Sequence, residues 1–213
     1  MELYGFGESG NAFKVAFALQ AMDIDWRLRK VAFFAGETRS AAFRNLNPMG
    51  EVPVLVDGDT VLSQSGVILD YLASKTGRFA GRSATERREV LRWLFWDNHK
   101  FTGQIGPLRF LTAFLPEEKR PAGAVPFLEG RVKAACKVLD THLAGREWLV
   151  GSAPTVADLS LCGYLWYPEP HGVERALWPG IDAWLDRLAA LPGWQHPYDV
   201  MPRSFPGADA RDK

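Results

Sequence analysis

The segment that decides the fold reads Asn47-Pro-Met-Gly-Glu-Val-Pro-Val-Leu-Val-Asp-Gly-Asp-Thr-Val-Leu-Ser-Gln-Ser-Gly-Val-Ile-Leu-Asp-Tyr71. Asp57-Gly58-Asp59 separates two apolar runs and predicts a β-hairpin, because glycine supplies the positive φ of a tight turn. Pro53 heads the first strand, where proline is tolerated although it gives no N–H to the ladder. Gln64-Ser65 follows the second strand and opens a helix over 66–75, with Ser65 as its N-cap. A proline in this place suggests a backbone shaped to meet a ligand.

Two features of this segment each allow two interpretations. The Val52-Pro53 bond fits an ordinary trans proline at a sheet edge, since only about 5–6 % of X–Pro bonds in folded proteins are cis. A cis bond would turn the Val52 N–H and C=O outward, toward the backbone of a peptide ligand. Gln64-Ser65 is either a capped turn or a carboxylate site, because a helix N-terminus with free N–H groups binds anions.

The rest of the chain extends this pattern to β-α-β-α-β-β-α and then to helices alone. The expected strands are 2–6, 26–31, 53–56 and 60–63. The expected helices include 38–45, 66–75, 85–115, 125–144, 155–167 and 181–191. A kink is expected in the long helix at Gly106-Pro107. A further helix follows the first strand and buries the apolar residues from 13 to 22. Prolines after residue 191 predict an extended end. The sequence thus predicts an α/β domain at 1–76, a linker at 77–83 and an all-helical domain at 84–213 with an extended C-terminal tail.

Composition narrows the functional class. The chain has 213 residues, 25 Lys+Arg and 25 Asp+Glu, with no charged run, so nucleic acid and anionic membranes are poor candidate partners. We expect no signal peptide and no membrane span. Cys136 and Cys162 form no CxxC motif, which favours a reducing, cytoplasmic setting. The four histidines lack the close spacing of a metal site, so no metal is expected.

The start of the first predicted helix carries polar and glycine residues with several possible roles. Gly5-Phe-Gly-Glu-Ser-Gly10 matches G-x-G-x-x-G, but the parallel repeats of a dinucleotide fold do not continue beyond it. We therefore expect these glycines to bring the chain close to another backbone or to a ligand. Ser9 and Asn11 lie at this helix start and either cap the helix or, in the case of Ser9, donate a hydrogen bond to an anion at its positive end, and one role does not exclude the other. Thr155-Val-Ala-Asp158 is interpreted as a structural capping box.

Together these pieces resemble the cytosolic glutathione S-transferases over essentially the whole chain. The matching stretches are Ser9-Gly-Asn-Ala-Phe-Lys, Asn47-Pro-Met-Gly-Glu-Val-Pro-Val-Leu, Leu62-Ser-Gln-Ser-Gly-Val-Ile-Leu-Asp-Tyr-Leu and Pro154-Thr-Val-Ala-Asp-Leu-Ser. The resemblance implies a thioredoxin-like N-terminal domain joined to an all-α C-terminal domain, a cytoplasmic homodimer, glutathione as co-substrate, and a transferase with a role in detoxification.

The resemblance also implies the site residues. Val52-Pro53 would be a cis-proline corner that pairs with the cysteinyl backbone of glutathione, and Gln64 and Ser65 would hold its γ-glutamyl end. Glu51 joins this binding set, and Arg39 is a candidate for the glycyl carboxylate. In the helical domain, Trp96 and His99 are candidates for the pocket of the second substrate.

Departures from the family pattern identify the thiol's partner. A tyrosine-type member has its phenol near residue 5, where this chain has glycine, and a cysteine-type member has its thiol near residue 9, where this chain has serine. Ser9, helped by Asn11, is therefore the best catalytic candidate, as in bacterial serine-type or mixed members. We expect the glutathione thiolate to attack an electrophilic carbon. The alternatives are a glutathione-dependent disulfide-bond oxidoreductase and a non-catalytic glutathione-binding protein of the same fold.

Overall fold

The structure, a computed structural model, describes residues 1–205. Contacts divide the chain into two compact units: among the described residues, unit 1 holds 1–76 and 192–205, and unit 2 holds 77–191. This division differs from the predicted one at the end of the chain, because residues 192–205 group with the first 76 residues and not with the helical part.

Unit 1 has the predicted order β-α-β-α-β-β-α, followed by a short C-terminal helix. Its strands are β1 (Glu2–Gly5), β2 (Arg27–Lys30), β3 (Val54–Asp57) and β4 (Thr60–Ser63). Its helices are α1 (Gly10–Ala21), η1 (Phe33–Ala35), η2 (Glu37–Arg39), α2 (Ala41–Leu46), α3 (Ser65–Thr76) and α9 (Pro197–Val200), of which η1 and η2 are short 3-10 turns. The predicted thioredoxin-like α/β architecture is confirmed.

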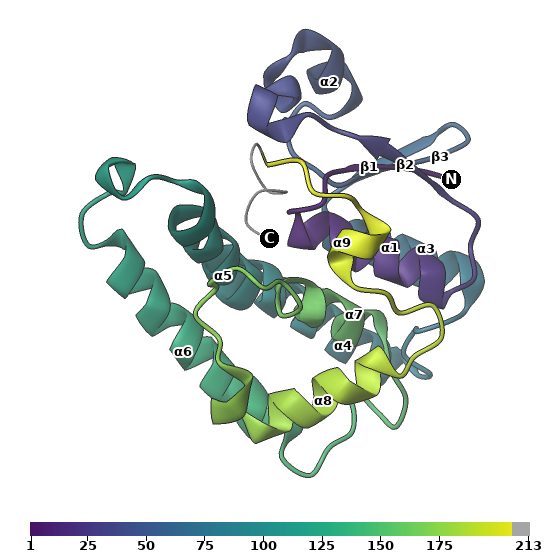
Figure 1. Cartoon of the computed structure of the whole chain (residues 1–213). Helices are drawn as coiled ribbons and strands as arrows, with labels where there is room; N and C mark the ends of the chain where they lie inside the picture. Colours follow the sequence, from purple (N-terminus) through teal and green to yellow (C-terminus); the bar gives the residue numbers. More distant parts are fainter. Residues whose placement is uncertain (206–213) are drawn as a thin grey trace. The chain divides into compact units, whose positions relative to one another are not determined.

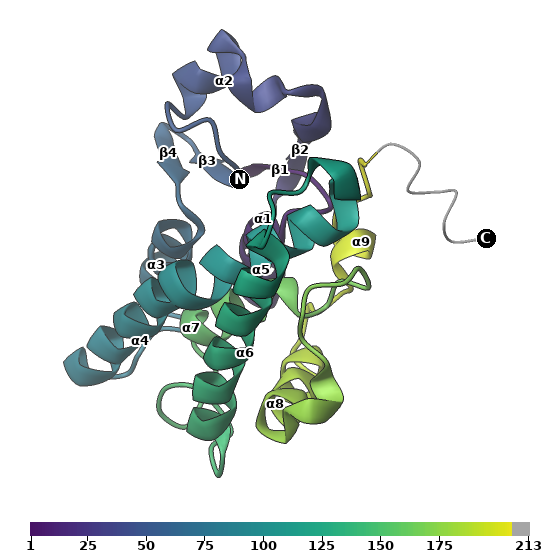
Figure 2. The same ribbon diagram turned by 90° about the vertical axis from the view of Figure 1, so that its left-hand side faces the viewer.

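The four strands form one mixed sheet in the order β2-β1-β3-β4, in which β1 and β2 are parallel and the other pairs are antiparallel. Helices α1 and α3 lie side by side on one face, and α2 lies on the other (Figure 1, Figure 2). Side chains alternate between the two faces of a strand. Tyr4 and Val54 accordingly pack with Phe43 of α2, whereas Leu3 and Leu55 belong to the alternate set and are buried.

The C-terminal part of unit 1 is not extended throughout, contrary to the prediction. Residues 197–200 form α9, which packs against α1, and Met201 is fully buried. Pro197 begins this short helix, because the N–H group at the first helical position has no partner within a helix and a proline there costs no hydrogen bond. The remainder of the predicted tail, 206–213, lies outside the described residues.

Within the described residues, unit 2 consists of helices and the loops between them. Its helices are α4 (Ala84–Trp96), η3 (Asp97–Phe101), α5 (Thr102–Arg109), η4 (Phe110–Phe114), η5 (Glu117–Lys119), α6 (Ala124–Leu143), α7 (Val156–Leu161), η6 (Cys162–Tyr164), η7 (Arg175–Leu177) and α8 (Pro179–Ala189). The segments η3 and η4 are π-helical, and η5, η6 and η7 are 3-10 turns. No helix in the described part of the chain is both long and apolar enough to cross a bilayer.

The long predicted helix over 85–115 exists, but its irregularities differ from the prediction. Pro107 lies inside α5, and the helical hydrogen bonding changes to the wider π pattern at η3 and again at η4. In η3, the buried Asp97 accepts hydrogen bonds from Thr102 Oγ1 (2.6 Å) and from Ser160 Oγ of α7 (2.5 Å). These bonds account for a polar group at the centre of unit 2.

Asp158 joins three parts of unit 2. Its Oδ1 accepts hydrogen bonds from Leu149 N (2.9 Å) and Trp184 Nε1 (3.0 Å). Its Oδ2 accepts bonds from Thr155 N (2.8 Å) and Thr155 Oγ1 (3.1 Å), which completes the predicted capping box at the start of α7. Burial raises the pKa of this fully buried carboxyl, and the four donors act in the opposite direction.

Replacing Asp158 with Ala is therefore expected to lower the free energy of unfolding by about 3 kcal/mol or more, because it leaves several buried donors without an acceptor. Chemical denaturation followed by tryptophan fluorescence measures this change. Asp70→Ala is the matched control, since Asp70 is exposed on α3 and should change stability by about 0.5 kcal/mol at most. Equal stability of the two variants would contradict the structural role of Asp158.

Candidate functional site

One end of the unit 1 sheet brings together three segments of the chain. Val54 pairs with Tyr4 of β1 and with Ser63 of β4. Continuing both antiparallel registers by one residue sets Pro53 between Gly5 and Gln64. From this end β1 leads into the turn that carries Ser9, and β4 leads into Gln64-Ser65. Helices α1 and α3 therefore both begin here and direct their positive ends to the same region.

Ser9 is the N-cap of α1, as predicted. Its Oγ accepts a hydrogen bond from Ala12 N (3.2 Å), and its side chain is almost buried, with 6 % of the residue exposed. Within residues 1–205, no acceptor is recorded for the proton of its hydroxyl. The capping role thus uses one lone pair of the oxygen and leaves the O–H available to a ligand.

Asn11 and Ser65 are brought together across the two helix starts. Ser65 Oγ donates to Asn11 Oδ1 over 3.3 Å. Ser65 is the first residue of α3 and not its N-cap, because Gln64 occupies the preceding position with a φ of +68°. A positive φ is uncommon outside glycine, and in folded proteins such residues cluster at functional sites.

The loop before β3 is fixed by its own polar side chains. Asn47 Nδ2 donates to the Glu51 carbonyl (2.8 Å), and Asn47 Oδ1 accepts from Met49 N (3.2 Å). Gln64 Nε2 in turn donates to Glu51 Oε2 (3.1 Å). Glu51 and Gln64, both predicted binding residues, therefore lie side by side next to Ser65.

The Val52-Pro53 peptide bond is cis, which answers the question that the sequence left open. No hydrogen bond is recorded within residues 1–205 for the N–H or C=O of the half-buried Val52. A backbone N–H and C=O without partners beside a ligand site can pair with an extended peptide.

Three further predicted residues lie on other elements of the chain. Arg39 ends η2 and is exposed, with its guanidinium near Gly36. Trp96 and His99 belong to unit 2, where Trp96 ends α4 and stacks with Phe101, with the ring centroids 6.2 Å apart. His99 is exposed in η3, and its carbonyl accepts a hydrogen bond from Gln104.

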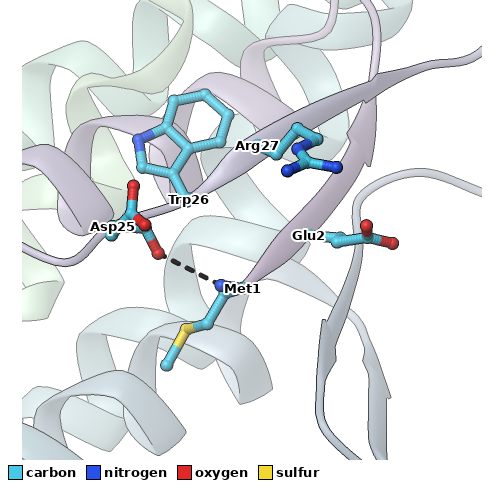
Figure 3. Close-up of a pocket in the computed structure, with 5 residues that line it drawn as sticks. All are labelled: Met1, Glu2, Asp25, Trp26 and Arg27. Carbon is cyan, nitrogen blue, oxygen red and sulfur yellow. Dashed lines mark hydrogen bonds between the residues drawn. The ribbon is translucent and has the colours of Figure 1, made fainter.

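A separate polar pocket lies at the other end of β1 (Figure 3). Its lining residues are Met1, Glu2, Asp25, Trp26 and Arg27, and the Met1 α-ammonium donates to the Asp25 carbonyl over 3.1 Å. Because these residues precede β1 and β2 or begin them, the pocket is remote along the strand from the turn that carries Ser9.

Two of the titratable groups buried in unit 2 have pKa values far from neutral pH. Burial raises the pKa of Cys136 to about 12. Burial, with the charge of Arg109, lowers the pKa of His171 to about 4. In the part of the chain that the structure describes, no cluster of His, Cys, Asp and Glu side chains could hold a metal ion.

Sequence reasoning missed Asn47 and Glu8. The Asn-Pro step before the hairpin was a usable signal for Asn47, because an asparagine side chain readily bonds the backbone two residues on. Glu8 is 4 % exposed and accepts hydrogen bonds from residues near the end of the chain, so no feature of the neighbouring sequence predicts its role.

Comparison with known proteins gives consistent matches over both units. Residues 1–74 match the family described as glutathione S-transferase, N-terminal domain, and residues 104–192 match glutathione S-transferase, C-terminal domain. The chain is 32 % identical to glutathione S-transferase 3 of Zea mays, with 95 % of each chain covered. It is 27 % identical to the disulfide-bond oxidoreductase YfcG of Escherichia coli, covering 90 % of this chain and 91 % of the relative.

Solved structures show the same architecture. A glutathione S-transferase from Xanthobacter autotrophicus superposes with a TM-score of 0.85 at 34 % identity, covering 99 % of this chain and 98 % of the other. A glutathione transferase homologue from Lodderomyces elongisporus, solved with two glutathione molecules per subunit, gives a TM-score of 0.83 at 28 % identity, with coverages of 94 % and 98 %.

Both cysteines are fully buried and neither forms a disulfide, so we expect neither thiol to react quickly with a disulfide reagent in the native protein at pH 8. In guanidinium chloride both should react, and Cys136→Ala should reduce that number from two to one. Spectrophotometric thiol titration measures both states. A thiol that reacts within seconds in the native protein would contradict this assignment.

Proposed function

The chain belongs to the glutathione S-transferase family, and on this premise we propose that it binds glutathione at the Ser9 end of the unit 1 sheet and activates the thiol for attack on an electrophilic small molecule. The observation that carries the proposal is the nearly buried Ser9 hydroxyl, which caps α1 through its oxygen and keeps its proton for a ligand. An O–H donor at a positive helix end stabilises a thiolate in preference to a thiol.

Binding of the tripeptide is assigned to the remaining residues of the group. The Val52 N–H and C=O, beside Pro53, pair with the cysteinyl backbone of glutathione. Ser65 and the N-terminus of α3 hold the γ-glutamyl carboxylate, and Gln64, positioned by Glu51, contacts the same end. Asn11 shares thiol activation with Ser9 and is held by Ser65. Arg39 serves the glycyl carboxylate, and Trp96 and His99 stay candidates for the second substrate.

The energetics divide between activation and positioning. A thiol of pKa about 8.5 is only about 3 % ionised at pH 7. Lowering the pKa by roughly two units multiplies the thiolate about 25-fold, for about 2.7 kcal/mol of differential stabilisation. Nucleophilicity falls with pKa at a slope of roughly 0.4–0.5, which removes most of that gain. Alignment of the sulfur with its target therefore supplies the larger share of the rate enhancement.

Disulfide reduction is a second candidate, favoured by the likeness to the disulfide-bond oxidoreductase YfcG. A glutathione thiolate would attack one sulfur of the substrate disulfide and expel the other as a thiolate. A second glutathione would then attack the mixed disulfide, releasing glutathione disulfide and the second substrate thiol. Both electrons come from glutathione, because Cys136 and Cys162 are buried in unit 2.

We further propose a homodimer that works in the cytoplasm and detoxifies electrophiles. Two buried cysteines that form no disulfide suit a reducing compartment. On α4, Leu91 and Phe95 lie one turn apart, and Phe95 is 75 % exposed. An apolar pair of this kind is typical of a surface that a partner covers.

Ser9→Ala is expected to raise the pKa seen in the pH profile of kcat/KM by about one unit and to lower kcat/KM at pH 6.5 roughly threefold, because the loss of thiolate outweighs the higher nucleophilicity of the more basic sulfur. Turnover of 1-chloro-2,4-dinitrobenzene and of a glutathione mixed disulfide, each with product analysis, separates the two reactions. Ser83→Ala is the matched control, since Ser83 also caps a helix, through Glu86 N at 3.1 Å.

Unchanged turnover in Ser9→Ala would remove Ser9 from catalysis. Glutathione binding without turnover of either probe would leave the non-catalytic alternative. Isothermal titration that detects no binding at millimolar glutathione would refute the proposed function as a whole.

Phe95→Glu is expected to convert a dimer into a monomer, since a charge would have to be buried in an apolar interface. Sedimentation velocity measures the change. Leu177→Glu is the control, because Leu177 is 63 % exposed in η7 and should leave the dimer intact. A wild-type protein that sediments as a monomer at micromolar concentration would overturn the proposal.

A further inference from the structure

The turn between β1 and α1 contains a buried acid next to Ser9. Glu8 accepts three hydrogen bonds from the far end of the chain. Its Oε1 accepts from Ser204 N (2.8 Å) and Phe205 N (2.7 Å), and its Oε2 accepts from Ser204 Oγ (2.7 Å). The two oxygens of a carboxyl group can together accept several hydrogen bonds. We call residues 201–205 the strap.

Close packing holds the strap at further points. A Cβ on Gly7 would lie 2.5 Å from the Pro202 carbonyl oxygen and 2.6 Å from that of Met201, so only glycine permits this approach. Met201 is fully buried, and the ring of Phe205 meets Phe34 edge-on with centroids 4.9 Å apart. The strap therefore touches the two residues that precede Ser9, through backbone packing at Gly7 and through hydrogen bonds at Glu8.

This arrangement constrains the position of Ser9. The Ser9 N–H donates to the Phe6 carbonyl (3.0 Å), so the turn from Phe6 to Ser9 is closed on itself. Gly7 and Glu8 form the outer side of that turn, and the strap covers both. A displacement of this turn moves the Ser9 hydroxyl with it, and misplacement by about 1 Å can reduce a reaction rate about 100-fold.

We propose that Glu8 is a positioning residue, which locks the strap onto the turn that carries Ser9 and so holds the hydroxyl in place for the glutathione sulfur. The inference rests on the proposed function of Ser9. Glu8 touches neither substrate in this scheme, and its effect on catalysis passes through the strap.

Two conservative substitutions of Glu8 separate the effect of side-chain length from the effect of side-chain charge. Glu8→Gln keeps the length of the side chain and an oxygen that can accept both backbone N–H bonds, but it removes the charge. Glu8→Asp keeps the charge and shortens the side chain by one methylene, so it loses the reach. We expect Glu8→Asp to lower kcat with 1-chloro-2,4-dinitrobenzene about tenfold while the KM for glutathione changes less than threefold, because other residues hold the tripeptide. Glu8→Gln should stay within threefold of wild type in both constants.

Amide hydrogen exchange supplies a readout that does not depend on turnover. Exchange at Ser204 and Phe205 should accelerate at least tenfold in Glu8→Asp and much less in Glu8→Gln. Glu129→Asp, at an exposed position of α6, is the control and should change nothing. If Glu8→Asp does not fold, Ser204→Ala, which removes one of the three donors, should show the same kcat loss in smaller measure.

The outcomes distinguish this inference from the proposed function. Faster exchange with unchanged kcat, or equal kcat losses in Glu8→Asp and Glu8→Gln, would overturn the positioning role and leave Ser9 catalysis standing. Failure of the proposed role of Ser9 would instead appear as unchanged turnover in Ser9→Ala, whatever the Glu8 variants show.

Discussion

The site depends on the point where the hydrogen-bonded pairing of strand β3 ends. Pro53 has no N–H, and the pairing of the central strand β3 begins only at Val54. Because β3 lies between β1 and β4, both neighbouring strands pass beyond the paired region at this end and turn into helices. Each helix starts with N–H groups that have no partner within the helix. The sheet thus ends where unpaired backbone and two positive helix ends meet, and an anionic peptide suits such a place.

Each polar side chain around this end of the sheet uses some of its atoms for hydrogen bonds within the protein and keeps others for a ligand. Ser9 caps α1 with its oxygen and retains its proton. Asn11 accepts the Ser65 hydroxyl through its carbonyl oxygen, which leaves its amide hydrogens to donate elsewhere. Gln64 uses its amide group to hold Glu51. Ser83 shows the purely local version of the same cap, since its oxygen accepts from Glu86 N at the start of α4.

The sequence predicts those features whose causes lie close together along the chain. The Gly58 hairpin, the Ser9 cap and the Thr155–Asp158 capping box each depend on residues within a few positions of one another. The contact of Glu8 with Ser204 joins residues 196 positions apart, and no periodicity or turn signal encodes it. The π-helical segment η3 is not predicted for a related reason, because its buried Asp97 bonds to Ser160 of α7, which lies 63 positions away. The C-terminal prolines signal irregular chain but not where that chain packs.

The presence of a carboxylate one residue before Ser9 needs a physical account, since a negative charge near a bound thiol favours the neutral form and opposes activation. Hydrogen-bond donors offset the cost of burying such a group. Two backbone N–H groups and one hydroxyl from the strap are among the donors to Glu8. The acid thus fixes the turn through hydrogen bonds that reach across the chain, while the Ser9 hydroxyl and the positive helix end act on the thiol.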